Sequence, residues 1–219
     1  MKPCLIFDLD GTLVDSLPGI AASLNRSLAA YQQPVHPEAA VRGFVGDGLR
    51  MLVERAAPTV TEPAHIDMLI AYFKKDYELN WQLGTKAYPG IIHMLDELQK
   101  SGFPLAVLSN KTHDFTVAMV RGLFPGIHFA KVLGLREGIP HKPHPAGAFQ
   151  IATALGTDAR NCVMIGDSTI DMETAVNADM KAVAVTWGYH DRPKLTAAGA
   201  RKFIDHPSEL ARILGEPGF

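Results

Sequence analysis

Short, mostly apolar runs recur along the chain, and polar or turn-forming residues follow each of them. A continuous apolar run of four to eight residues between turn signals is typical of a strand that is buried on both faces. Segments with helical spacing of apolar residues separate most of these runs, which predicts a parallel sheet covered by helices on both faces. We therefore expect an α/β fold with a Rossmann-like, doubly wound parallel sheet. The predicted strands are residues 4–7, 105–108, 131–133, 162–165 and 182–185.

Residues 16–82 follow a different pattern. Ile20, Leu24 and Leu28 recur at helical spacing, and later apolar residues mark one face of a longer helix that reaches Trp81. This segment has no run that is typical of a strand. We therefore expect residues 16–82 to form an α-helical insert in an α/β core made of residues 1–15 and 83–219. An insert at this point would lie over the carboxyl end of the first strand, where open α/β sheets bind ligands.

Two carboxylates end the first predicted strand. Asp8 follows the apolar run directly, and Asp10 stands one residue further, before Gly11 and Thr12. Carboxylates at the end of a buried strand cost free energy unless a cation or hydrogen-bond donors compensate for their burial. By itself the Asp-x-Asp-Gly pattern is equally compatible with a solvated turn. Its interpretation therefore depends on the rest of the chain.

Polar residues also follow later strands. Ser109, Asn110 and Asp167 stand at strand ends, and Lys142 lies on a proline-rich loop between them. Because the carboxyl ends of parallel strands meet at one edge of the sheet, we expect these side chains to share a crevice with Asp8. A hydroxyl, an amide and a lysine are donors that suit a phosphoryl group. We therefore predict that Ser109, Asn110 and Lys142 bind phosphate.

The carboxylates of this crevice suggest a metal and a division of roles. Asp8, Asp10 and Asp167 supply hard oxygen ligands, which favour Mg²⁺ over zinc or copper, and Asp171 adds a charge beside them. Asp8 is the better nucleophile, because the metal and Lys142 would keep it ionised, and it would form an aspartyl-phosphate. Asp10 could protonate the leaving oxygen and later deprotonate the attacking water.

Two further basic residues are candidates for contacting the substrate. Lys111 follows Asn110 directly and could reach the substrate or lie on the surface. Arg50 follows a glycine-rich loop and could reach a substrate carboxylate. An arginine at such a position is more often a solvated helix residue, so both interpretations stay open.

These motifs, in this order and spacing, resemble the four signatures of the haloacid-dehalogenase-like phosphohydrolases, and the resemblance covers nearly the whole chain. It implies that Asp8 is the nucleophile, that Asp10 is the acid and base, and that the backbone carbonyl of Asp10 binds Mg²⁺. It also implies that residues 16–82 are a small helical cap. Residues 88–90 and 187–189 resemble the phosphoglycolate phosphatase-like subgroup, which implies hydrolysis of 2-phosphoglycolate. The four motifs are Asp8-Leu9-Asp10-Gly11-Thr12, Leu108-Ser109-Asn110-Lys111, Lys142-Pro143-His144-Pro145 and Gly166-Asp167-Ser168-x-x-Asp171.

Several other functions use similar residues. Pyrophosphate, sugar phosphates and nucleotides are alternative substrates, and a phosphomutase of the same family would keep these motifs while shielding the aspartyl-phosphate from water. A dehalogenase would need neither Asp10 nor Mg²⁺. A phosphoacceptor signalling domain would lack the second carboxylate and the helical insert. A binding protein without catalysis is a further alternative, although every required residue type is present.

Composition excludes some classes of partner. The 219 residues carry a formal net charge of −2, so we expect no binding to nucleic acid or to an anionic membrane. No apolar run approaches the roughly 20 residues of a membrane span. Cys4 and Cys162 lie in apolar runs and are expected to be buried thiols in a reducing compartment. We therefore expect a cytoplasmic monomer or homodimer whose partner is a small phosphate ester.

Overall fold

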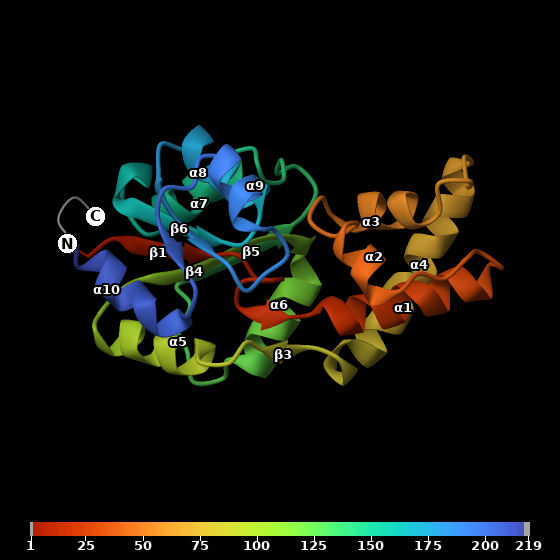
Figure 1. The fold of residues 1–219 in the computed structure, drawn as a ribbon, viewed down its shortest axis with the longest axis horizontal. Coiled ribbons are helices and arrows are strands. Elements are labelled where there is room, and N and C mark those ends of the chain that lie inside the picture. The colour runs from red at the N-terminus through yellow and green to blue at the C-terminus, as the bar shows by residue number, and fades with distance from the viewer. Residues whose placement is uncertain (1, 217–219) are drawn as a thin grey trace. The chain divides into compact units, whose positions relative to one another are not determined.

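The computed structural model describes residues 2–216 (Figure 1). The chain divides into two compact units. One contains the residues up to Val14 and those from Ala87 onward, and the other contains Asp15–Lys86. Each unit is described separately below.

The first unit is built on a six-stranded sheet in which every pair of neighbouring strands is parallel. This topology confirms the expected α/β fold. All the predicted strands are present, and one of them, β4, continues through Ser109, Asn110 and Lys111. In spatial order the strands are β5 (Lys131–Leu135), β4 (Leu105–Thr112), β1 (Cys4–Phe7), β6 (Cys162–Gly166), β7 (Lys181–Val185) and β8 (Phe203–Ile204).

Helices cover both faces of this sheet (Figure 1). Alternate residues of the strands, such as Ile6 and Met164, pack with Ile151 and Ala175 from two helices on one face, α7 and α8. The opposite face is covered by α5, α6 and α10. The helices of this unit are α5 (Ile91–Lys100), α6 (His113–Leu123), α7 (Ala146–Ala154), α8 (Thr169–Asn177), α9 (Arg192–Ala197) and α10 (Leu210–Leu214), with short 3₁₀ turns at Ala159–Asn161 and Pro207–Glu209.

The strand order changes direction beside β1. From β1 the chain builds the sheet in one direction through β4 and β5, and it then returns to add β6, β7 and β8 on the other side. Connections therefore leave β1 and β6 in opposite directions, and the carboxyl ends of strands at such a point are where open α/β sheets commonly bind ligands. Cys4 and Cys162 are register partners on β1 and β6, and both are buried free thiols.

The second unit is helical. Its elements are α1 (Leu17–Ala30), α2 (Glu38–Arg42), α3 (Leu49–Ala56), α4 (Pro63–Asn80) and a 3₁₀ turn at Trp81–Leu83. Leu24 and Leu28 of α1 and Phe73 and Tyr77 of α4 are buried, and the Phe73 and Tyr77 rings stack with centroids 5.1 Å apart. The buried stripe of each long helix thus forms the core of this unit.

Two short strands that the sequence did not predict pair where the chain leaves and re-enters the first unit. They are β2 (Val14–Asp15) and β3 (Lys86–Ala87), and they form a separate two-stranded sheet. None of the helices in residues 2–216 is long and apolar enough to cross a membrane.

Candidate active site

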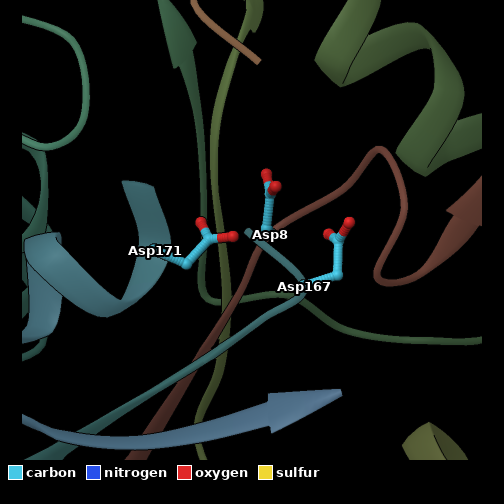
Figure 2. A group of neighbouring side chains, drawn as sticks. All are labelled: Asp8, Asp167 and Asp171. Atoms are coloured by element: carbon cyan, nitrogen blue, oxygen red, sulfur yellow. The ribbon is translucent and has the colours of Figure 1, made fainter. Parts of the chain in front are cut away.

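Three buried carboxylates gather at the carboxyl edge of the central strands (Figure 2). Asp8 follows β1, Asp167 follows β6, and Asp171 lies in the first turn of α8. One oxygen from each carboxylate lies within 4.8 Å of an oxygen from each of the others. Such a set of hard oxygen ligands fits a divalent cation such as Mg²⁺.

Burial dominates the electrostatics of Asp8, whose exposed fraction is 8%. Burial raises the pKa of Asp8 well above its ordinary value, the neighbouring carboxylates Asp171 and Asp167 raise it further, and Lys142 opposes the rise. The Leu9 backbone N–H donates a hydrogen bond of 2.7 Å to Asp8 Oδ1. For Asp8, one lysine and one N–H therefore do not offset burial and the charges of the two neighbouring carboxylates, and a bound cation would.

Asp167 is held by donors from two loops. The Thr12 hydroxyl donates to Asp167 Oδ1 at 2.7 Å, and the Tyr189 backbone N–H donates to Asp167 Oδ2 at 2.8 Å. Burial and the Asp171 carboxylate nevertheless raise the pKa of Asp167 to about 7. Hydrogen bonds thus fix the position of the Asp167 carboxylate, while burial and Asp171 disfavour its negative charge. A bound metal ion would offset that cost, as expected for a metal ligand.

The two loops can close around Asp167 because each brings a glycine to the contact. A Cβ on Gly188 would lie 2.2 Å from the Cβ of Asp167. A Cβ on Gly11, which has a φ of +85°, would lie 2.3 Å from Asp167 Oδ2. The Trp187 indole N–H donates to the Thr12 carbonyl at 3.0 Å and ties the loops together. These supporting roles of Thr12 and Trp187 were not predicted from the sequence, and their signal was a position in the loop that follows a buried strand, β1 for Thr12 and β7 for Trp187.

Lys142 is clamped between two carboxylates of the cluster. Its Nζ lies 2.9 Å from Asp8 Oδ1 and 2.6 Å from Asp171 Oδ1, and only 3% of its side chain is exposed. Burial lowers the pKa of Lys142, but the Asp171 and Asp8 carboxylates outweigh burial and raise it overall. The lysine therefore stays protonated and supplies a fixed positive charge beside Asp8.

Asn110 holds the main chain of Lys142. Its Nδ2 donates to the Lys142 carbonyl at 2.9 Å, and its Oδ1 accepts from the Lys142 backbone N–H at 2.8 Å. From the sequence we expect this amide to contact phosphate. In the structure both of its polar atoms are engaged with the loop that carries Lys142, and a phosphate contact stays a prediction.

Ser109 and Lys111 flank Asn110 on β4, in the part of the strand where its register with β5 shifts. Ser109 is buried, and its hydroxyl oxygen accepts a hydrogen bond of 3.2 Å from the Lys111 backbone N–H. The Lys111 ammonium lies 3.2 Å from each oxygen of Asp10. Lys111 is therefore part of the crevice and is largely buried there.

The metal ligands that the sequence analysis proposed are brought together in part. Among the described residues, the cluster of neighbouring carboxylates contains Asp8, Asp167 and Asp171. The Asp10 carboxylate instead pairs with Lys111. A metal contact through the backbone carbonyl of Asp10, which the family resemblance implies, stays a prediction.

Arg50 belongs to the helical unit. It lies on α3 with 52% of its side chain exposed, and it pairs with Asp67 and, at 3.6 Å, with Glu54. Its guanidinium is therefore engaged with carboxylates of its own unit. A contact between Arg50 and a substrate carboxylate stays a prediction.

The chain is similar to known proteins of one family. Residues 5–185 match the family model described as haloacid dehalogenase-like hydrolase. The chain is 37% identical to the phosphoglycolate phosphatase of Mesorhizobium japonicum over 194 residues, which cover 87% of this chain and 86% of that protein. It is 33% identical to the phosphoglycolate phosphatase of Rhodospirillum rubrum, with 99% and 92% covered. The crystal structure of a predicted phosphoglycolate phosphatase from Haemophilus somnus 129pt has a TM-score of 0.90 at 27% identity and covers 97% of each chain.

Proposed function

The chain is a phosphatase of the haloacid dehalogenase-like hydrolase family, and from this premise we propose that it hydrolyses 2-phosphoglycolate with Mg²⁺. The family assignment confirms the resemblance of the sequence motifs. Two relatives named phosphoglycolate phosphatase, each at least 33% identical over most of both chains, support the choice of substrate.

The observation that carries the proposal is the buried carboxylate cluster with Lys142 clamped inside it. The carboxylates of Asp8 and Asp167 would hold Mg²⁺, which would supply positive charge to the phosphoryl oxygens and keep Asp8 ionised. Lys142 and the Ser109 hydroxyl would bind the same phosphoryl oxygens. The crevice would then position the phosphorus atom against a carboxylate oxygen of Asp8.

The reaction then takes two displacements at phosphorus. An Asp8 carboxylate oxygen bonds to phosphorus while the bond from phosphorus to the glycolate oxygen breaks, and Asp10 gives its proton to that leaving oxygen. Water next attacks the aspartyl-phosphate. Asp10 takes a proton from this water, the bond between phosphorus and Asp8 breaks, and inorganic phosphate leaves. Both carboxylates thereby return to their starting state.

The helical unit, Asp15–Lys86, is the proposed cap of this enzyme. Its helices would contribute substrate contacts and exclude water during the first displacement, with Arg50 as the candidate contact. The buried free thiols Cys4 and Cys162 support a reducing compartment such as the cytoplasm.

A substrate panel with Mg²⁺ tests the proposed activity. We expect 2-phosphoglycolate to give the highest kcat/KM among phosphate esters that include pyrophosphate, sugar phosphates and nucleotides. Release of inorganic phosphate separates a phosphatase from a phosphomutase. Excess EDTA should abolish the phosphatase activity, and full activity in EDTA would refute the metal requirement. A clear preference for another ester would refute the substrate.

Asp8→Asn tests the nucleophile. This variant should lose turnover and should carry no phosphoryl group after mixing with substrate, because an amide oxygen is a poor nucleophile. Asp96→Asn, at an exposed pair with Lys100 on α5, is the matched control and should keep wild-type activity. Appreciable hydrolysis by Asp8→Asn would remove Asp8 from this role.

A further inference from the structure

Two lysines line the crevice, and their surroundings differ. Lys142 lies 2.9 Å and 2.6 Å from two carboxylates, and Asn110 also holds its main chain. The Lys111 ammonium lies 3.2 Å from both oxygens of the Asp10 carboxylate. Charge-assisted hydrogen bonds between nitrogen and a carboxylate are usually about 2.7–2.9 Å long. The ion pair of Lys111 is therefore the looser and more readily exchanged of the two.

The groups that would bind the phosphate of 2-phosphoglycolate do not also provide a partner for its carboxylate. At neutral pH 2-phosphoglycolate carries a phosphate dianion and, one methylene group away, a carboxylate. A divalent cation, Lys142 and Ser109 would serve the phosphate. A further cation within reach would have to serve the carboxylate, since a desolvated carboxylate without a donor is costly. When all are ionised, the ionic side chains of the crevice include the carboxylates of Asp8, Asp10, Asp167 and Asp171 and the ammonium groups of Lys111 and Lys142.

The position of Lys111 suits this task. Ser109 and Lys111 are two residues apart on β4, and the Lys111 backbone N–H donates to the Ser109 hydroxyl at 3.2 Å, so the two residues are close neighbours. A lysine side chain readily covers the short separation between the phosphate and the carboxylate of such a small ester. Only 8% of the Lys111 side chain is exposed, so a bond from its ammonium to a substrate would be largely shielded from water. Arg50, the other candidate cation, already pairs with Asp67 and Glu54.

We propose that Lys111 is the specificity-determining residue for the substrate carboxylate, and that its ammonium moves from Asp10 to that carboxylate when the substrate binds. This inference rests on the proposed function, since it requires a substrate that carries a second anionic group. It predicts selection for a carboxylate beside the phosphate, and it assigns that selection to the core unit of the enzyme.

Binding of two non-hydrolysable ligands tests the inference without requiring turnover. The first, 3-phosphonopropionate, replaces the ester oxygen of 2-phosphoglycolate with a methylene group and keeps the carboxylate. The second, propylphosphonate, replaces the carboxylate with a methyl group. Dissociation constants would be measured by calorimetry with Mg²⁺ for the wild type, Lys111→Gln, Lys111→Arg and Lys100→Gln. Lys100 is an exposed lysine on α5 and provides the matched control.

We expect the wild type and Lys100→Gln to bind 3-phosphonopropionate about 10- to 100-fold more tightly than propylphosphonate. In Lys111→Gln this ratio should fall to about one, while the affinity for propylphosphonate stays within about threefold of the wild type. Glutamine can still donate a hydrogen bond to Asp10 but carries no charge. Lys111→Arg, which keeps the charge, should retain most of the preference.

Three outcomes would overturn the inference. The first is a wild type that binds both ligands equally well, and the second is a preference that survives in Lys111→Gln. The third is an equal loss of affinity for both ligands in that variant. The kcat/KM of the wild type for 2-phosphoglycolate decides the proposed function separately. A wild type that hydrolyses 2-phosphoglycolate and a Lys111→Gln variant that keeps the ligand preference would refute only the role of Lys111.

Discussion

The surroundings of Asp167 disfavour its negative charge, so Asp167→Asn should stabilise the metal-free protein at neutral and alkaline pH. The side chain is 1% exposed, and burial together with Asp171 raises its pKa from the ordinary 3.8 to about 7. At about 1.4 kcal/mol per pKa unit, this rise corresponds to about 4 kcal/mol. Ionised Asp167 thus destabilises the folded protein by up to about this amount when no metal is bound.

The pH dependence has a definite sign. The folded protein binds the Asp167 proton more tightly than the unfolded chain does. The resulting stability is therefore fully present below pH 3.8 and is lost as the pH rises through about 7. Asparagine carries no such proton. The stability of the variant should accordingly be closer to that of the wild type near pH 5 than at pH 8, where the variant gains most.

Thermal unfolding with EDTA between pH 5 and 8.5 measures this difference. For a chain of this size about 1 kcal/mol shifts Tm by roughly 2–4 °C. The amide has one acceptor oxygen for the donors Thr12 and Tyr189, which reduces the gain, so we expect an increase of roughly 5–15 °C at pH 8. Saturating Mg²⁺ should raise the Tm of the wild type by mass action and should have a much smaller effect on the variant. Asp96→Asn, an exposed carboxylate, is the control.

A Tm for Asp167→Asn that is no higher than that of the wild type at pH 8 would refute this reasoning. A gain of equal size at pH 5 and pH 8 would also refute it, since the stabilisation would then not come from removing a charge.

Two further substitutions test the supports of the site. Asn110→Ala removes both hydrogen bonds to the main chain of Lys142, so the free energy of unfolding in urea should fall by about 2–4 kcal/mol, and a loss below about 0.5 kcal/mol would contradict this role. Gly188→Ala would place a methyl group 2.2 Å from the Cβ of Asp167, so the Mg²⁺ affinity measured by calorimetry should fall about 10- to 100-fold. Gly126→Ala, which has open space around it, should leave that affinity unchanged, and equal affinities in the two variants would show that Asp167 tolerates the displacement.

Hydrophobic patterning predicted the strands of the sheet because strands buried on both faces must be continuously apolar. It failed where local pattern carries no such signal. The strand β4 was predicted over residues 105–108 but continues to Thr112, which is a register partner of Leu135 on β5. The polar residues of that extension have no apolar pattern, and their pairing depends on a strand far along the chain. The two-residue strands β2 and β3 were missed for the same reason.

The sequence by itself determined which residues meet at the edge of the sheet. Parallel strands have all their carboxyl ends on one side, so the residues that follow them must converge. It also determined the family, through motifs that this convergence explains. These conclusions needed only the order of elements along the chain and the residue type at each strand end.

Only the tertiary structure decided which partner each of these side chains contacts. Asn110 faces the loop of Lys142, Lys111 faces Asp10, and Asp171 shares Lys142 with Asp8. Each contact joins segments that are far apart in sequence, over a distance of a few ångströms. Such contacts depend on loop packing and on the phase of strand alternation, and residue type and spacing do not specify these to the accuracy that a hydrogen bond requires.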